Sequence, residues 1–61
     1  MRSVDVYTFY FEGGRQIARK WLASDEDAFE YAKYLCDDQG ASIEVARGEE
    51  LDLIAIFDPD E

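Results

Sequence analysis

The first third of the chain has the residue pattern of paired β-strands. Residues 4–11 read VDVYTFYF and are dense in β-branched and aromatic side chains, and a second such run, RQIARKWLA, follows over 15–23. Gly13 and Gly14 stand between the two runs. Two runs of this kind around a glycine pair are typical of an antiparallel hairpin. The pattern therefore predicts a hairpin over residues 4–23.

The register of this hairpin follows from where its large side chains must go. A three-residue loop over 13–15 pairs Phe11 with Ile17 and Tyr7 with Trp21, so that all four share one face. A two-residue loop would send Ile17 and Trp21 to the opposite face, because a slip of one residue inverts every side chain. We therefore predict the three-residue loop.

The last third of the chain repeats the pattern. The run ASIEVAR over 41–47 leads into a turn at 48–50, and LDLIAIF returns over 51–57. A three-residue loop again gathers the apolar side chains best. In that register one face carries Ile43, Val45, Leu51, Leu53, Ala55 and Phe57.

An amphipathic helix is predicted between the two hairpins. Ser24 is a favourable N-cap, and the acidic residues 25–27 place negative charge in the first turn, where the helix dipole favours it. Gly40 is a natural stop. Apolar residues recur at the spacing of one helix stripe, and two more widen it: Ala28, Tyr31, Ala32 and Leu35, with Phe29 and Cys36.

The order of elements is ββαββ, which predicts an α+β fold: a four-stranded, mainly antiparallel sheet with one helix packed on one face. A right-handed connection through the helix favours the strand order 2-1-3-4. The 61 residues form a single domain, 1–61, in which we expect 58–61 to be a frayed acidic tail. The predicted core beneath the helix consists of Tyr7, Phe9, Phe11, Ile17, Trp21, Ile43, Val45, Leu53 and Phe57.

The sheet face away from the helix is the first candidate for function. A solvated face normally carries polar residues, and contiguous exposed apolar area often marks an association surface. The alternative is that β-propensity alone placed valine and isoleucine there. The predicted face carries Val4, Val6, Thr8, Tyr10, Ala18, Leu22, Ile54 and Ile56, beside Lys20, Glu44 and Asp52. The interaction face that we predict is centred on Val6, Tyr10, Ile54 and Ile56, with a homodimer as its simplest product.

Charge is distributed unevenly along the chain. Net charge is −9; residues 1–23 hold four basic and two acidic side chains, whereas 24–61 hold two basic and thirteen acidic ones. The acidic part is either a solvated surface or a surface that meets a basic protein. Negative charge at a helix C-terminus is unfavourable, which supports a functional interpretation. The predicted acidic partner surface comprises Glu26, Glu30, Asp37 and Asp38.

Catalytic and cofactor chemistry has little support. The chain has no histidine, and it has no nucleophile–base motif or phosphate-binding glycine loop, so we expect a non-enzymatic protein without a cofactor. Cys36 falls on or beside the apolar helix stripe, where a small hydrophobic residue fits. The spacing of Asp37, Asp38 and Glu44 matches no metal-binding loop, so no metal site is predicted.

Nucleic acid and membranes are also poor partners. Arg15, Arg19 and Lys20 lie near two aromatic residues and could form a small basic patch, but a net charge of −9 opposes phosphate binding. The longest unbroken apolar run, 53–57, is too short to cross a bilayer. The single cysteine fits a reducing compartment, and no apolar signal segment follows Met1, so we expect a cytoplasmic protein that is complete as given.

Three short segments resemble a family of small uncharacterised proteins common in alphaproteobacteria: YTFYF over 7–11, SDEDA over 24–28 and IEVARG over 43–48. That resemblance implies a hairpin–helix–hairpin arrangement and no established activity. Residues 1–35 are also similar to the hairpin and helix of HicB-like antitoxins, acidic proteins that neutralise RNA-cleaving toxins. The glycine- and cysteine-containing strand of those antitoxins is missing before the helix here.

Two functions follow as hypotheses. The first is a small acidic protein-interaction module that self-associates through the uncovered apolar sheet face. The alternative is an acidic inhibitor or nucleic-acid mimic, similar to an antitoxin, that covers a basic site on a partner protein.

Overall fold

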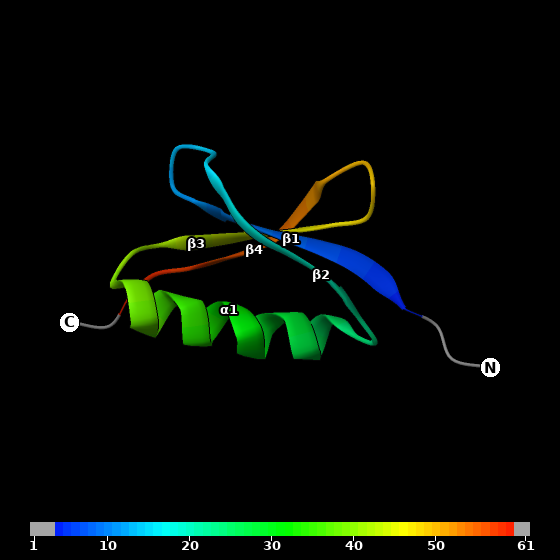
Figure 1. Cartoon of the computed structure of the whole chain (residues 1–61), viewed down its shortest axis with the longest axis horizontal. Coiled ribbons are helices and arrows are strands. Elements are labelled where there is room, and N and C mark those ends of the chain that lie inside the picture. The colour runs from blue at the N-terminus through cyan, green and yellow to red at the C-terminus, as the bar shows by residue number, and fades with distance from the viewer. Residues whose placement is uncertain (1–3, 60–61) are drawn as a thin grey trace.

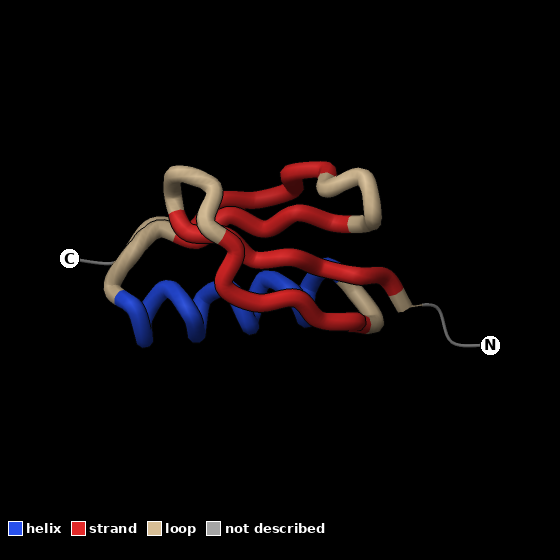
Figure 2. Tube along the Cα trace, turned by 45° about the horizontal axis from the view of Figure 1, so that its top comes forward, coloured by secondary structure: helices blue, strands red, loops and turns tan. Residues whose placement is uncertain are grey.

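A four-stranded sheet and one helix make up the fold. The computed structural model describes residues 4–59. Its elements are β1 (Asp5–Phe11), β2 (Gln16–Leu22), α1 (Asp25–Gln39), β3 (Ile43–Arg47) and β4 (Asp52–Phe57). The strand order is β2-β1-β3-β4, neighbouring strands are antiparallel, and α1 packs on one face (Figure 1, Figure 2). The predicted ββαββ fold and strand order are confirmed, while residues 60–61 of the predicted tail lie outside the described residues.

Both ends of α1 are fixed by the residues that the sequence predicted. The Ser24 hydroxyl accepts a hydrogen bond from the Asp27 N–H at 3.2 Å. At the other end Gly40 adopts the left-handed conformation (φ 63°), and its N–H donates to the Cys36 carbonyl at 2.8 Å. A Cβ at Gly40 would meet no neighbour. Glycine is therefore favoured there by backbone conformation alone.

The core lies between α1 and the facing side of the sheet. Ala28 and Ala32 are fully buried, and their small side chains let the helix approach the strands closely. The Phe9 ring meets the Tyr31 ring edge-on, with 5.0 Å between the centroids. The buried cluster contains Tyr7, Phe9, Ala28, Ala32, Leu35, Cys36, Ile43 and Val45. Its four strand residues were all predicted for the core, and three more predicted residues pack against it half-buried: Phe11, Ile17 and Phe57.

The register predicted for the first hairpin is wrong. The turn has three residues, as expected, but they are 12–14, and the Phe11 N–H closes the turn by donating to the Arg15 carbonyl at 2.8 Å. The ladder then shifts by one residue, which leaves Ile17 in a β-bulge. A bulge inserts one unpaired residue, so it inverts the inside–outside pattern of the rest of the strand.

Trp21 and Lys20 exchange places as a consequence. Val6 lies opposite Trp21 and Tyr7 lies opposite Lys20. Trp21 therefore points away from α1 and is 64% exposed, which corrects its predicted core position. Lys20 faces the helix instead, with its Nζ atom 4.5 Å from the centre of the Tyr31 ring. Three residues predicted for the opposite face lie on the helix side: Ala18, Lys20 and Leu22.

The second hairpin departs from its prediction in the same way. Its turn spans four residues, 48–51, rather than three. The ladder shifts by one residue at Ile54. As a result Leu53, predicted for the core, turns away from the helix and is 55% exposed, while Asp52 moves to the helix side. Phe57 lies beyond the bulge and keeps its predicted place against the core.

The two turns rise on the side of the sheet away from α1 (Figure 1). Bulges increase the local twist of a strand, and each hairpin carries one. A recess lies between the turns, with Gly14 of the first turn and Leu51 of the second among its lining residues. The sheet face without a helix therefore has a recess as well as an apolar composition.

Candidate protein-interaction surface

The sheet face away from α1, called the far face below, is the candidate site. Residues that pair across neighbouring strands share a face, and the face alternates along each strand. In residues 4–59 no helix lies over this face (Figure 2). The far face comprises Val6, Thr8 and Tyr10 of β1, Arg19 and Trp21 of β2, Glu44 and Ala46 of β3, and Leu53 and Ile56 of β4.

Exposed apolar side chains concentrate on this side of the molecule. Residues 4–59 contain six large apolar side chains that are exposed: Val4, Trp21, Tyr34, Leu51, Leu53 and Ile56. Tyr34 belongs to α1, whereas Trp21, Leu53 and Ile56 lie on the far face and Leu51 lines the recess on the same side. Single exposed apolar residues are normal on a protein surface, whereas four on one side of the molecule form a patch of the kind that marks an interface.

Small residues form the floor of the far face. Val6, Thr8 and Ala46 are buried, although no second layer covers them. Larger residues are their neighbours on the same face: Trp21 lies opposite Val6, and Tyr10 is two residues from Thr8 on β1. The Thr8 Oγ1 atom makes no hydrogen bond within the described part of the chain. A buried hydroxyl left in this way costs about 1–3 kcal/mol, so a group that bonds it would be stabilising.

A hollow of about 240 Å³ opens on the far face between the two turns. Leu51 lines it from a left-handed backbone conformation (φ 58°), which is unusual for a bulky residue. Its side chain stays exposed in spite of this strained position. The hollow is lined by Tyr10, Gly14, Glu44, Ala46, Leu51 and Leu53. It combines apolar walls with one phenol and one carboxylate.

The four residues predicted for the interaction face have different places. Val6 lies on the floor of the far face, and Tyr10 lines the hollow. Ile56 is exposed on the same face. Ile54 is the bulged residue and packs against the core, so its predicted place on the open face is wrong. The pattern missed Trp21, Leu51 and Leu53, because the positions of the bulges leave no mark in the alternation of apolar residues.

One ionic cluster connects the helix to the sheet. The Tyr7 hydroxyl donates to Asp25 Oδ1 at 2.6 Å, and Arg47 Nη1 donates to Asp25 Oδ2 at 2.8 Å and to Oδ1 at 3.0 Å. Burial of the phenol, followed by its hydrogen bond to Asp25, raises the pKa of Tyr7 to about 12. The hydrogen bonds from Tyr7 and Arg47 lower the pKa of Asp25, and the bond to Asp25 raises the pKa of Arg47.

This cluster connects the first turn of α1 to two strands of the sheet. Asp25 is the first residue of α1, so its bonds fix the start of the helix to β1 and β3. Tyr7 is only 2% exposed, whereas the side chains of Arg47 and Asp25 are 42% and 43% exposed.

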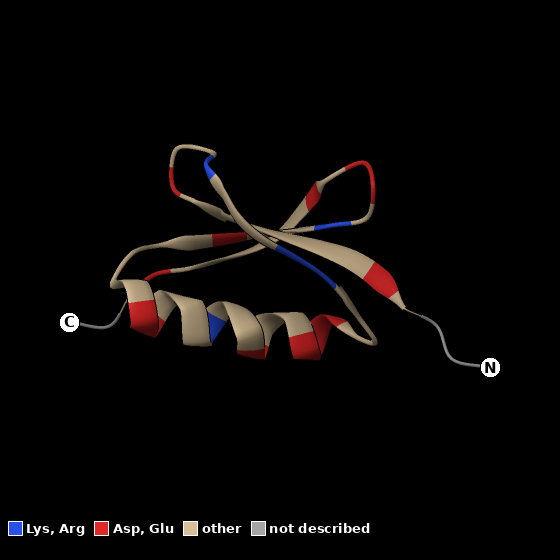
Figure 3. Ribbon diagram, in the orientation of Figure 1, with Lys and Arg blue, Asp and Glu red and all other residues tan. Residues whose placement is uncertain are grey.

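The predicted acidic residues lie on the opposite side of the molecule from the far face. Glu26, Glu30, Asp37 and Asp38 are all exposed on α1, and Figure 3 shows acidic residues along this helix. The last turn of α1 contains no basic residue that would offset the two aspartates there. Three of the four, Glu26, Glu30 and Asp37, follow the i, i+4, i+11 spacing of a single helix face.

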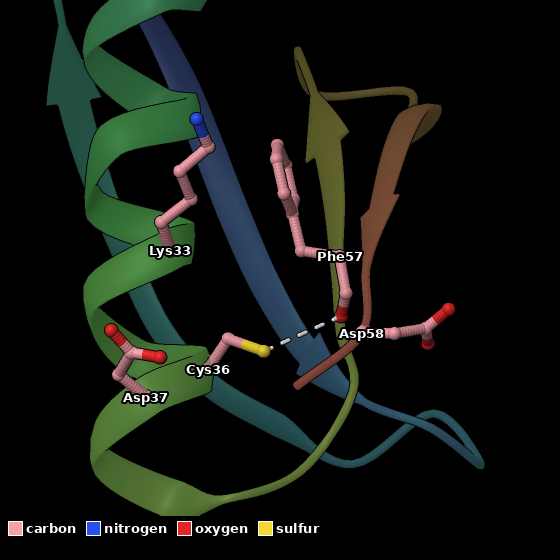
Figure 4. A pocket seen from close by; sticks show the side chains of 5 residues that line it. All are labelled: Lys33, Cys36, Asp37, Phe57 and Asp58. Atoms are coloured by element: carbon pink, nitrogen blue, oxygen red, sulfur yellow. Dashed lines mark hydrogen bonds between the residues drawn. The ribbon is translucent and has the colours of Figure 1, made fainter. Parts of the chain in front are cut away.

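Cys36 lies beside a second hollow near the end of α1. The hollow is lined by Lys33, Cys36, Asp37, Phe57 and Asp58 (Figure 4). The Cys36 Sγ atom points toward β4 and donates to the Phe57 carbonyl at 3.7 Å, and the residue is buried. The thiol thus serves as part of the core, as its place on the helix stripe predicted.

Residues 4–59 contain no group of three or more cysteine, aspartate or glutamate residues placed to hold a metal ion. In the same part of the chain, α1 is neither long enough nor apolar enough to cross a membrane. Searches of family models, curated proteins and solved structures found no match to this chain. The far face must therefore be interpreted from its own geometry and chemistry.

Proposed function

We propose that this protein is a non-enzymatic interaction module that self-associates through the far face. The observation that supports this proposal is the gathering of four of the six exposed large apolar side chains on or beside that face. A standard interface takes about 800 Å² from each partner. The accessible surface of the protein is 4355 Å². Because the interface needs close to a fifth of that area, the whole far face must take part, and not the hollow alone.

The charges of the far face are compatible with a twofold dimer. Arg19 on β2 and Glu44 on β3 lie on this face on either side of β1. In an isologous interface the cation of one copy can face the carboxylate of the other, and the contact is made twice. The acidic residues of α1 belong to the other layer, which Figure 3 shows on the far side of the sheet from the turns. Their mutual repulsion across the dimer is screened, since the Debye length at physiological salt is about 8 Å.

The test is the dependence of molecular mass on concentration. Sedimentation equilibrium of the wild type should show a monomer–dimer equilibrium. Leu53→Glu places a charge in the middle of the apolar patch and should give a monomer. Tyr34→Glu is the matched control, because it changes net charge equally at a similarly exposed residue (61% against 55%) on α1. This control should dimerise like the wild type.

Two results would overturn the proposal. One is a wild-type protein that stays monomeric up to about millimolar concentration, which is the dissociation constant of a very weak complex. The other is an equal loss of dimer in Tyr34→Glu and Leu53→Glu. That outcome would assign the association to net charge rather than to the far face.

A specific observation favours a second candidate, the acidic inhibitor that covers a basic site. Asp37 and Asp38 lie in the last turn of α1, where the helix dipole disfavours them, and no basic residue is present there to offset this cost. A partner with a basic surface would reverse that cost on binding. Capture of a basic protein from lysate should then be lost at high salt and in Asp37→Asn/Asp38→Asn. Capture that is insensitive to both changes would eliminate this candidate.

A further inference from the structure

We propose that the β4 edge of the sheet binds an extended polypeptide segment with lysine or arginine at both ends, which adds to the sheet as a fifth strand. β4 is one of two edge strands, and no element of residues 4–59 pairs with its outer side. This inference goes beyond self-association through the far face, because it concerns the backbone of β4 and a different partner.

The two edge strands of the sheet differ in how well they are protected against pairing with another chain. Charged residues within an edge strand discourage other chains from pairing with it. β2 carries Arg19 and Lys20 in its middle, whereas β4 has no charged residue between Asp52 and Asp58. The five residues between those aspartates, 53–57, are all apolar. β4 is therefore the edge at which strand addition meets least opposition.

The backbone at Ile56 is directed outward. The Gly48 N–H donates to the Val6 carbonyl at 2.7 Å. In an antiparallel sheet, the backbone N–H and C=O groups of successive residues point alternately to one neighbouring strand and to the other. Glu44 is an even number of residues before Gly48, so its backbone groups also point to β1. Glu44 lies opposite Ile56. The N–H and C=O of Ile56 therefore point away from the sheet, toward the space where an added strand would lie.

The charges around β4 define the partner. Asp52 and Asp58 are exposed at its two ends, and Glu49 and Glu50 are exposed in the turn before it. A segment with a basic residue at each end meets a carboxylate at both, whether it adds parallel or antiparallel. A second copy of β4 fits badly, because antiparallel pairing centred on Ala55 sets Asp52 opposite Asp58 twice. Like charges directly opposite one another are destabilising.

The experiment uses a synthetic peptide with five alternating valine and threonine residues between two lysines. The control peptide has glutamates in place of the lysines. Titration into isotopically labelled protein at low salt should show that the lysine peptide binds about tenfold more tightly than the glutamate peptide. The reason is that two exposed charge contacts are attractive with lysine and repulsive with glutamate. Amide hydrogen exchange should slow at Ile56 when the lysine peptide binds and stay unchanged at Trp21, in the edge strand β2.

Two variants separate the backbone of Ile56 from its side chain. Ile56→Pro removes the outward N–H but no bond to β3, and it should weaken the lysine peptide by about tenfold, the effect of one lost hydrogen bond. Ile56→Thr keeps the N–H and should bind within about threefold of the wild type. Equal binding of the two peptides, or slowed exchange at Trp21, would overturn the proposal. Slowed exchange at Ile56 but not at Trp21 on raising protein concentration without peptide would also overturn it. Dimerisation through the far face covers both residues, whereas a second copy paired along β4 covers Ile56 alone.

Discussion

The hydrogen bond from Tyr7 to Asp25 makes a measurable contribution to stability, and Tyr7→Phe isolates it. The substitution keeps the buried ring and removes only the hydroxyl, which donates to the Asp25 carboxylate at 2.6 Å. Hydrogen bonds to charged groups contribute about 1.5–3 kcal/mol. Asp25 keeps its bonds to Arg47 and its side chain is 43% exposed, so water can replace the lost donor. We therefore expect the lower end of that range, about 1.5 kcal/mol.

This loss is large for a domain of this size. A ΔΔG of 1 kcal/mol shifts Tm by roughly 4–8 °C in a domain of 60–100 residues, so Tyr7→Phe should melt about 6–12 °C lower at neutral pH. Far-UV circular dichroism is the suitable signal, because Trp21 is exposed and reports little on the core. Tyr34→Phe is the matched control, since it removes the same hydroxyl from an exposed ring on α1. It should leave Tm unchanged within about 2 °C, as surface substitutions usually do.

The effect of Tyr7→Phe should also depend on pH. The folded pKa of Tyr7 is about 12, above the ordinary value of 10.0, so the fold favours the neutral phenol. Stability that depends on a raised pKa is fully present below the unfolded pKa and is lost as pH rises toward the folded one. The difference between the wild type and Tyr7→Phe should therefore shrink between pH 10 and pH 12. A gap that stays constant across that range, or a Tm loss below about 2 °C at pH 7, would refute the proposed role of the hydroxyl.

Three further predictions follow. The pKa of Asp25 is lowered by its bonds to Tyr7 and Arg47, so its contribution to stability is present above the unfolded pKa and is lost as pH falls through the folded pKa. Between neutral and low pH, the free energy of unfolding measured with urea should therefore fall less in Asp25→Asn than in the wild type. An equal fall in both proteins would contradict this prediction. Gly40→Ala should lower stability by about 1 kcal/mol, because only the left-handed backbone opposes a side chain there; an unchanged urea midpoint would show that the C-cap can rearrange. Phe9→Ala should cost about 3–5 kcal/mol, whereas Trp21→Ala should cost under about 1 kcal/mol in dilute solution. A comparable loss for both would favour the register with a loop over 13–15, in which Trp21 is a core residue.

The sequence was a good guide wherever local chemistry decides the structure. Ser24 and Gly40 bound the helix as predicted, because a capping hydroxyl and a left-handed glycine act within one turn of the chain. The central strands were also predictable. Phe9 and Val45 lie opposite each other in the β1–β3 ladder and are fully buried. Their predicted place in the core is correct even though the registers of the two hairpins are not.

The errors began at the two bulges. A bulge depends on how the sheet twists beneath the helix, which is a property of the assembled layers and not of the residues at the bulge. Ile17 and Ile54 are ordinary strand residues by composition, yet each of them shifts its ladder. Trp21 and Leu53 were therefore placed on the wrong side. The same two residues are exposed on the far face, so periodicity alone could not identify the whole of the proposed interface.

The central position of β1 has a consequence for the order of folding. β1 pairs with β2 across a short turn, but it also pairs with β3, which β2 and α1 separate from it in the sequence. Phe11 must come to lie opposite Ile43, and Tyr7 opposite Arg47. Closing a long loop costs chain entropy before any contact can offset it, and such non-local pairing slows folding. We therefore expect the first hairpin and the helix to form early and the β1–β3 seam to close at the rate-limiting step. Destabilising substitutions at that seam should slow refolding more than they speed unfolding.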